Sequence, residues 1–239
     1  MYQRPLDEFE LDEAPHFSLM PRALDAVLGR VLIPQQISLL HGPSRGPLTA
    51  LAHLAAVCAV RKGDGRSFFL DAASNYSPTL ARTLCGRSGD ASEVLSRITV
   101  GRLLSLSDLR QAASDLAAMT DIRIVVIDSL TSVLNMSGGP SSAGRQRELF
   151  RTFEELRTMV NKTGTHVLMT DHSSLDWTSG QPSPIGGNIV AHNVDSVVRI
   201  GRLDARDDLV SIFVERCPLA QPPTGVIVSI TSRGIRGIK

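Results

Sequence analysis

The sequence is poor in lysine and in cysteine, and both shortages narrow what the protein can be. Only three of its 25 basic residues are lysines, so the rest are arginines, whose planar guanidinium groups suit contacts with phosphates and bases. A high arginine content is equally consistent with solubility. The three cysteines, Cys58, Cys85 and Cys217, are scattered, with no CxxC pair and no histidines at metal spacing. We therefore expect buried thiols, no disulfide framework and no bound metal.

Long apolar segments are also lacking. No apolar run approaches the length that crosses a membrane, and the amino terminus, MYQRPLDEFELDE, is acidic where a signal peptide is basic and then apolar. We expect a cytoplasmic protein that does not bind membranes. With 239 residues, 42% of them hydrophobic, the chain is long enough for one α/β domain with a sizeable core.

Charge is unevenly distributed, although the net charge is only +1. Residues 1–13 contain one arginine and five acidic residues, which gives −4, so the rest of the chain carries +5. We expect residues 1–16 to be an acidic tail, either flexible or a docking strip, and residues 17–239 to form a single domain.

Short runs rich in β-branched residues alternate with segments that have apolar residues at helical spacing. The predicted strands cover residues 36–41, 66–71, 97–101, 122–128 and 165–171. The predicted helices between them cover residues 48–60, 77–85, 106–119 and 144–160. This alternation predicts an α/β fold with a mostly parallel central sheet and helices on both faces.

After residue 193 the helical pattern stops. Residues 194–201, 209–215, 225–231 and 234–239 are predicted to be strands that extend the sheet with antiparallel pairs. Two earlier stretches, 135–144 and 173–187, are rich in turn formers and lack a regular pattern, so we expect irregular loops there. Both follow predicted central strands, and ligands bind at the carboxyl edge of such sheets.

The segment GPSRGPLT, residues 42–49, follows the first predicted strand and partly matches the phosphate-binding motif G-x-x-x-x-G-K-[ST]. Its first glycine and its threonine match. Pro47 and Leu48 replace the second glycine and the lysine, which removes an N–H donor and the cation, although Arg45 could partly compensate. The alternative is an ordinary turn in which Pro47 is the first residue of a helix.

The predicted strand 122–128 ends in Asp128. A carboxylate at the end of a parallel strand, beside a phosphate loop, is a usual magnesium anchor, and the alternative is a cap for the following turn. We favour descent from a magnesium site that no longer holds metal. If a nucleotide is held at all, its predicted contacts are Gly42, Ser44, Arg45, Thr49 and Asp128.

These segments resemble the RecA/RadA recombinase family, including the short archaeal RadA paralogs called RadB and the eukaryotic strand-exchange proteins. IVVIDSLTSVL is similar to the family's Walker B strand, and GRQRELFRTFEELRTMVNKTGTHVLMTDH resembles the helix and strand that follow. PIGGNIVAH, residues 184–192, is nearly identical to the end of the family's second DNA-binding loop. LMPRALDAVLGRVLIPQQISLLHG is similar to the lead-in to the Walker A loop, with Arg30 and Val31 in place of a glycine pair. The resemblance runs from about residue 17 to the carboxyl terminus and implies a RecA-like P-loop NTPase core with a degenerate Walker A motif.

The departures from the family concern ATP chemistry and assembly. Where the family has DTEG, this chain has DAAS, residues 71–74, so Ala73 replaces the carboxylate that positions the attacking water. General-base assistance is worth roughly 10²–10⁴ in rate. Together with Pro47 and Leu48, this loss predicts a protein that is not an active ATPase and has no catalytic residues. No Phe-x-x-Ala polymerisation motif precedes residue 17, so we do not expect assembly by that route.

The resemblance also implies that two loops at the sheet edge bind single-stranded DNA. Gly138 and Gly139 in the first loop let the backbone approach a phosphate, and Trp177, the only tryptophan, could stack on a base. His172 and His192 lie where the family couples the nucleotide to its DNA loops. The predicted DNA-binding residues are Arg145, Arg147, Arg151, Trp177, Gly186, Gly187 and Asn188.

Each of these residues also has a purely structural interpretation. The three arginines could pair with Glu148, Glu154 and Glu155 on a helix surface. The tryptophan could cover the core of its own loop, and His192 could be a buried, hydrogen-bonded histidine.

We predict a non-catalytic paralog that binds single-stranded DNA, a RadA-type recombinase or another paralog, and that assists homologous recombination and DNA repair at the nucleoid. One alternative is a weak DNA-dependent ATPase that still holds ATP and magnesium. Another is a pseudo-ATPase scaffold subunit that does not bind DNA. An RNA substrate also stays open, because stacking and phosphate contacts do not distinguish the sugars.

Overall fold

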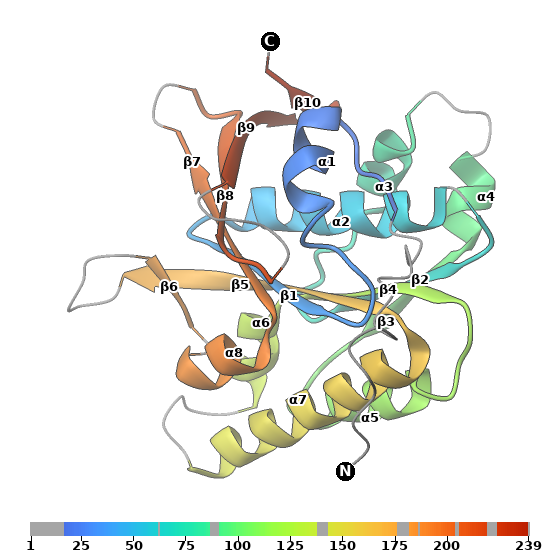
Figure 1. Cartoon of the computed structure of the whole chain (residues 1–239), viewed down its shortest axis with the longest axis vertical. Helices are drawn as coiled ribbons and strands as arrows, with labels where there is room; N and C mark the ends of the chain where they lie inside the picture. Colours follow the sequence, from blue (N-terminus) through green and yellow to red (C-terminus); the bar gives the residue numbers. More distant parts are fainter. Residues whose placement is uncertain are drawn as a thin grey trace, which may run out of the picture.

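The computed structural model describes residues 17–61, 63–86, 91–137, 143–175, 182–185, 187–203, 206–218 and 224–238. They form a central sheet with helices on both faces (Figure 1). The strands are β1 (Ile37–Gly42), β2 (Arg66–Asp71), β3 (Ile98–Arg102), β4 (Ile122–Asp128), β5 (His166–Leu175), β6 (Pro182–Pro184), β7 (Ser196–Arg202), β8 (Leu209–Arg216), β9 (Thr224–Thr231) and β10 (Gly234–Gly237). The helices are α1 (Arg22–Leu28), α2 (Arg45–Arg61), α3 (Pro78–Leu84), α4 (Ala91–Ser96), α5 (Leu106–Leu116), α6 (Leu130–Met136), α7 (Ala143–Thr163) and α8 (Gly187–Asn193).

The sheet has the strand order β10-β9-β8-β7-β1-β5-β4-β2-β3, and β6 pairs with the end of β5. Strands β7, β1, β5, β4, β2 and β3 run parallel, whereas β8, β9 and β10 pair antiparallel. This confirms the predicted mostly parallel sheet with antiparallel carboxyl-terminal strands. Because β1 lies near the middle of this order, between β5 and β7, the loop that follows it lies at the centre of the carboxyl edge.

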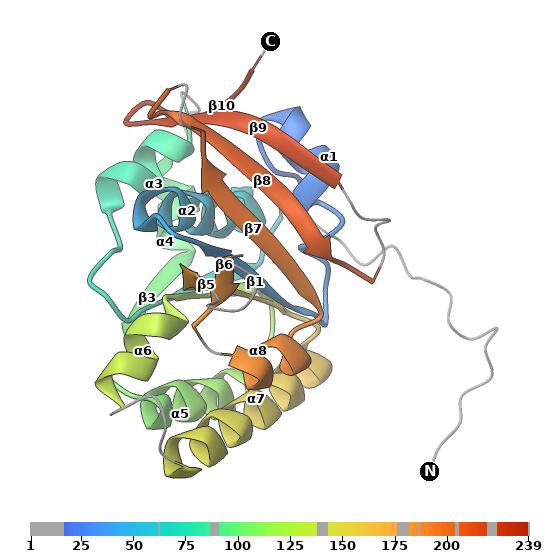
Figure 2. The same ribbon diagram turned by 90° about the vertical axis from the view of Figure 1, so that its left-hand side faces the viewer.

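Two apolar cores hold the layers together, one on each face of the sheet. Helices α1, α2, α3 and α4 cover one face, and α5, α7 and α8 cover the other, as the two perpendicular views show (Figures 1 and 2). Almost every residue of α2 from Pro47 to Val60 is buried. In β4, residues 124–127 are fully buried because helices cover both faces, which explains its continuous apolar run.

Three of the helices have a serine as their N-cap residue. Ser77, Ser105 and Ser129 each lie immediately before a helix, and each hydroxyl accepts a hydrogen bond from the backbone N–H three residues later. Such N-caps satisfy donors that have no partner within the helix. These N-caps therefore define the first residues of α3, α5 and α6.

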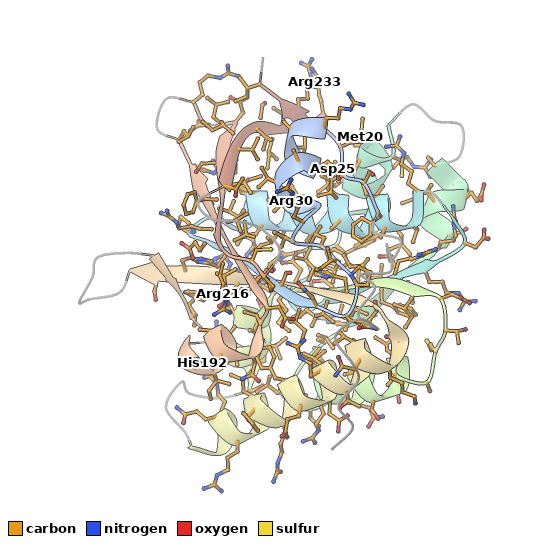
Figure 3. All side chains as sticks on the ribbon, in the orientation of Figure 1. Met20, Asp25, Arg30, His192, Arg216 and Arg233 are labelled. Atoms are coloured by element: carbon orange, nitrogen blue, oxygen red, sulfur yellow. The ribbon has the colours of Figure 1, made fainter. Side chains whose placement is uncertain are left out.

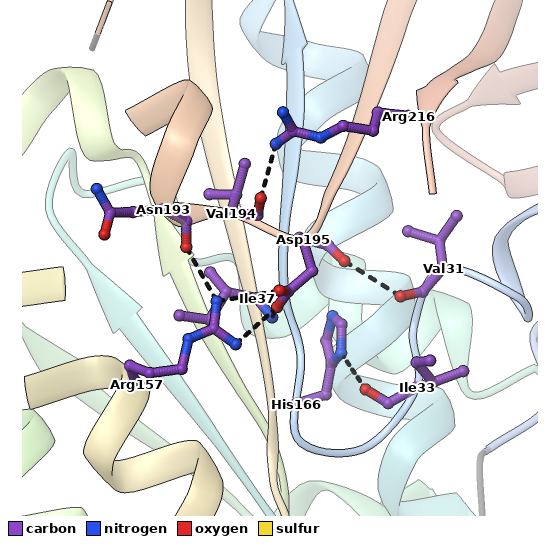
Figure 4. A network of polar contacts seen from close by, with 10 residues as sticks. Val31, Ile33, Ile37, Arg157, His166, Asn193, Val194, Asp195 and Arg216 are labelled. Carbon is purple, nitrogen blue, oxygen red and sulfur yellow. Dashed lines mark hydrogen bonds and ion pairs between the residues drawn. The ribbon is translucent and has the colours of Figure 1, made fainter. Parts of the chain in front are cut away.

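An ion pair fastens β7 to the helical layer. The guanidinium of Arg157 on α7 donates to both carboxylate oxygens of Asp195, at 2.8 and 3.1 Å, and to the carbonyl of Asn193 (Figure 4). Asp195 also accepts the backbone N–H of Ile37 at 2.8 Å. Arg216 on β8 donates to the carbonyl of Val194 at 2.6 Å (Figure 4). The start of β7 is therefore tied to α7, β1 and β8.

The structure differs from the predictions in the following elements. Helix α6 covers the start of the stretch 135–144, which we expected to be irregular throughout. In the stretch 173–187, residues 173–175 and 182–184 form the antiparallel β5–β6 pair, so the prediction of an irregular loop is wrong there. Proline lacks an N–H and signalled a loop, but a short strand with one free edge tolerates it. Helices α1 and α4 were not predicted.

Candidate functional site

The loop that partly matches the phosphate-binding motif is shorter than the motif requires. Strand β1 ends at Gly42 and α2 begins at Arg45, so Pro43 and Ser44 are the only residues between the two elements. A working phosphate loop needs a longer run of non-helical backbone whose N–H groups converge. Pro47 is the third residue of α2 rather than its first, which corrects the predicted helix start. It still lies in the first turn, where proline is tolerated.

Gly42 has a packing role. A Cβ atom at this position would lie 2.3 Å from the carbonyl oxygen of Ile200 on β7, and an approach this close to backbone excludes any side chain. The glycine that matches the motif is therefore required by the neighbouring strand whether or not a phosphate binds.

Leu48, which occupies the position of the motif lysine, is a core residue. Leu48 is 1% exposed and belongs to the apolar core on the α2 face of the sheet. Arg45 is exposed at the start of α2. A Cβ atom on Gly46 would lie 3.8 Å from Nη2 of Arg202, the last residue of β7, so this second guanidinium lies beside the loop. Two arginines flank the loop, and Arg202 was not found from the sequence.

The carboxylate of Asp128 is held by side chains of its own chain. It is 1% exposed, and it accepts hydrogen bonds from the hydroxyls of Thr49 at 2.7 Å and Thr170 at 2.6 Å. The amide of Asn75 contacts it more weakly, at 3.4 Å. The structure thus brings Thr49 and Asp128 together as the motif predicts. Their contact satisfies both groups, because a buried carboxylate needs donors when no cation is present.

The turn after β2 is built around Asp71. Its carboxylate accepts the backbone N–H groups of Ala73, Asn75 and Tyr76, each at 3.0 Å. The aspartate therefore stabilises the turn locally, as Asx turns do. Because Ala73 has only a methyl group, this turn supplies no carboxylate at the position of the family's water-positioning residue.

A buried histidine, missed by the sequence analysis, lies beneath this turn. His53 on α2 stacks on Tyr76 with ring centroids 5.1 Å apart and lies 4.7 Å from the ring of Phe69. Its Nδ1 contacts the carbonyl of Thr49 at 2.8 Å, and its Nε2 accepts the N–H of Ser77 at 2.9 Å. A carbonyl only accepts and an amide only donates, so the ring is neutral with its proton on Nδ1. Burial lowers the pKa of His53 in agreement with this neutral form, while the contact with Thr49 and the charges of Asp128 and Asp71 oppose it.

The three arginines predicted to bind DNA differ in exposure. Arg145 is 9% exposed and has a partner within the chain. Arg147 and Arg151 are exposed, four residues apart and therefore on one face of α7. No ion pair among the described residues includes either of them, so the structure gives no support to pairing with Glu148, Glu154 or Glu155.

Both predicted DNA-binding loops are described only in part. Gly138 and Gly139 of the first loop, and Trp177 and Gly186 of the second, lie outside the described residues. Gly187 has a φ of +62°, a conformation that favours glycine, and begins α8; Asn188 follows it in the helix. Helix α8 lies beside α7 in both views (Figures 1 and 2), and the two helices are in contact.

The two predicted coupling histidines have different surroundings. His172 is half-buried on β5, and its backbone N–H donates to the hydroxyl of Thr131 at 2.8 Å. The same hydroxyl donates to the fully buried carboxylate of Asp171. His192 lies on α8 and is exposed (Figure 3), so its interpretation as a buried histidine is wrong.

A chain of polar contacts joins the β5–β6 pair to the carboxyl-terminal strands. His41 is fully buried on β1; its Nδ1 contacts the hydroxyl of Ser173 at 2.8 Å, and its Nε2 contacts Glu215 at 2.9 Å. Arg199 lies 2.9 Å from the other carboxylate oxygen of Glu215. Burial raises the pKa of Glu215, but the contacts with His41 and Arg199 outweigh it and leave the pKa below its ordinary value. The network therefore fixes the base of the β5–β6 pair.

Within the described residues, no group of three histidine, cysteine, aspartate or glutamate side chains could hold a metal ion. The three cysteines are buried and unpaired, as predicted. No described helix has the length and apolar character needed to cross a membrane.

The Rad51 family model matches residues 17–237, which is nearly the whole chain. This chain belongs to the Rad51 family. A DNA repair protein RAD51 from Mycosarcoma maydis is 28% identical over 186 residues, covering 71% of this chain and 55% of its own length. DNA repair protein RAD51 homolog 1 from Arabidopsis thaliana is 24% identical over 236 residues, covering 91% and 68%. This chain thus spans about half to two thirds of the length of these curated relatives.

A solved structure shows the same fold. The crystal structure of the RadB recombinase superposes with a TM-score of 0.76 at 20% identity, and the match covers 91% of this chain and 97% of that one. The predicted RecA-like fold and the resemblance to the RecA/RadA family are confirmed.

Proposed function

We propose that this chain is a non-catalytic paralog of the Rad51 family that binds single-stranded DNA and assists homologous recombination and DNA repair. The observation that carries the proposal is the pair Arg147 and Arg151 on α7. Both are exposed, and neither has an ion-pair partner among the described residues. Because β5 follows α7 and starts at the amino edge of the sheet, this first half of α7 lies toward the carboxyl edge. Two guanidinium groups there fit the phosphates of a nucleic acid strand.

The state of the ATP-related positions supports the non-catalytic part. Leu48 lies in the core, Ala73 carries no acid, and the Asp128 carboxylate is held by two hydroxyls. Each position therefore either contacts other residues of the fold, as Leu48 and Asp128 do, or lacks the group that ATP hydrolysis requires, as Ala73 does. A RadA-type recombinase or another paralog is the protein partner that family membership favours, and the DNA repair names of the relatives support a role in the same process.

Fluorescence anisotropy with a labelled single-stranded oligonucleotide tests DNA binding. We expect binding that weakens steeply between two salt concentrations, because phosphate contacts release counterions. The double variant R147A/R151A removes two contacts, so the slope of log K against log salt should become shallower by about 1.4, or 0.7 per contact. Arg82, which is exposed on α3 on the other side of the sheet, supplies the control variant R82A. No binding at low salt contradicts the proposal.

A second function, weak ATP binding, is favoured by one observation. Arg45 and Arg202 flank the loop at residues 42–49, and two guanidinium groups could contact a phosphate chain where the lysine is missing. Isothermal titration with Mg-ATP, with R45A and R202A as variants, decides it. Binding that both variants abolish supports a weak nucleotide site. If no heat of binding is measured, the chain does not bind ATP and the non-catalytic proposal is supported. If a paralog co-purifies with the chain and DNA binding is absent, the scaffold role is favoured.

A further inference from the structure

Helix α7 exposes an aromatic ring between Arg147 and Arg151, the two arginines that have no ion-pair partner among the described residues. Phe150 is 48% exposed, whereas its neighbours Leu149 and Phe153 are buried in the core. A hollow of about 490 Å³ on this face of the helix is lined by Gln146, Arg147, Phe150, Arg151 and Glu154. These positions follow the spacing of one helix face, so the ring and both guanidinium groups project from the same side.

The core does not require this phenylalanine. Burying an aromatic side chain stabilises a fold, and Phe150 loses much of that stabilisation because its side chain stays half exposed. It is also the only large apolar side chain in the hollow, since the other four lining residues are polar or charged. An apolar strip that receives a partner helix would need several such residues.

The charges on this face favour an anion. Arg147 and Arg151 are like charges at i and i+4, which repel each other when no partner is bound. The carboxylate of Glu154 marks the end of the hollow toward the middle of α7. Glu148 and Glu155 are only half exposed on the same helix. The first half of the exposed face therefore combines two cations with one exposed aromatic ring.

We infer that Phe150 is a stacking platform for an unpaired base and that Arg147 and Arg151 hold the phosphates on either side of it. The inference rests on the proposed function and adds a residue that determines specificity. A duplex hides the faces of its bases, whereas a single strand offers them, so the ring selects single strands over duplexes. Arginine–phosphate contacts alone do not make this distinction.

The test compares binding of a single strand and of a duplex of the same sequence. Phe150→Ala should weaken single-strand binding between about 5-fold and 100-fold, and leave duplex binding and the salt slope unchanged. Phe150→Leu keeps an apolar side chain without a π-face and should behave like the alanine variant, whereas Phe150→Trp should restore binding. Met119→Ala, at another exposed apolar residue (42%), is the matched control. Urea unfolding shows that each variant is folded.

The outcomes separate this inference from the proposed function. If R147A/R151A weakens binding and F150A does not, Phe150 is no platform and the proposed function stands. If neither variant changes binding, or if the protein does not bind single strands at all, both the proposed DNA site on α7 and the inference about Phe150 are wrong. If F150L binds as the original protein does, burial of apolar surface replaces stacking, which overturns the inference and points to a protein partner at this face.

Discussion

The hydroxyl of Thr49 donates a hydrogen bond of 2.7 Å to the carboxylate of Asp128. Thr170 donates to the second oxygen of the same carboxylate at 2.6 Å. The two residues that match a magnesium site by sequence are thus joined directly. The stability of the chain without any nucleotide should depend on them.

Replacing Thr49 by valine should lower the free energy of unfolding by about 1–2 kcal/mol in the absence of nucleotide. The variant removes a donor from a buried charged acceptor, and hydrogen bonds to charged groups are worth more than neutral ones. Urea unfolding measures the change. Thr83→Val is the control, because the Thr83 hydroxyl bonds a carbonyl at an exposed position of α3 and its loss should have little effect. Equal stability of the Thr49 variant and the original protein would contradict the structural role.

Leu48→Lys should fail to restore a phosphate loop. The side chain at this position is 1% exposed, so a lysine would place an ammonium group in an apolar core. We expect a loss of at least about 2 kcal/mol in unfolding free energy and no gain in Mg-ATP binding by isothermal titration. Leu48→Met, which keeps the volume, should cost less than about 1.5 kcal/mol. A stable lysine variant that gains ATP affinity would show that the loop can still open.

Asp195→Ala should destabilise the protein by about 2–3 kcal/mol. It leaves the Arg157 guanidinium and the N–H of Ile37 without their acceptor, and the value allows for screening because the pair is about one third exposed. Asp195→Asn keeps the acceptor for Ile37 and should lose less. Glu93→Ala breaks a far more exposed pair with Arg97 and should change stability by no more than about 0.5 kcal/mol. Unfolding in urea at low and high salt checks all three variants.

Stability should fall as the pH drops from 7 to 5. Burial lowers the pKa of His166 to about 4, although its hydrogen bond to the carbonyl of Ile33 and the charge of Asp195 oppose the shift. The unfolded chain has the ordinary pKa of about 6.5, so between pH 6.5 and 4 it binds a proton that the folded chain does not. The stability that the neutral His166 contributes is therefore fully present above pH 6.5 and is lost as the pH falls toward 4. From pH 7 to 5 we expect a loss on the order of 1–2 kcal/mol.

His166→Asn provides the comparison for this pH dependence. Asparagine keeps a donor near the position of Nδ1 and does not titrate, so the variant should show a smaller difference between pH 7 and pH 5 in urea unfolding. A residual slope of the same sign is expected from His53, whose pKa is also lowered by burial. An unchanged slope in the variant would mean that other groups carry the effect.

The strands of the sheet could be predicted because the burial of their residues leaves a regular pattern in the sequence. Strand β4 is apolar throughout for this reason, and β8 alternates in burial because only one of its faces is covered by helices. The start of α2 could not be placed, since proline is accepted anywhere in the first helical turn. Strand β6 was missed because its two prolines signal a loop.

The contacts of the candidate site could be predicted only where a motif names both partners. Thr49 and Asp128 were found in this way. His41 and Arg202 were missed because their neighbours in the site are distant in sequence; His41 and Glu215 are 174 residues apart. Spacing along the chain contains no signal for such pairs. Phe150 was passed over because an apolar residue in a helix is normally assigned to the core.

The contacts of Gly42 and Asp71 bear on how other chains with these residues should be classified. The glycine is required by the carbonyl of Ile200, and the aspartate is occupied by three N–H groups of its own turn. Both residues would therefore persist in a descendant that had lost every trace of nucleotide affinity. If a family member retains only this glycine and this aspartate, the two residues show that it has inherited the turns after β1 and β2. They do not show that it binds or hydrolyses a nucleotide, which has to be measured.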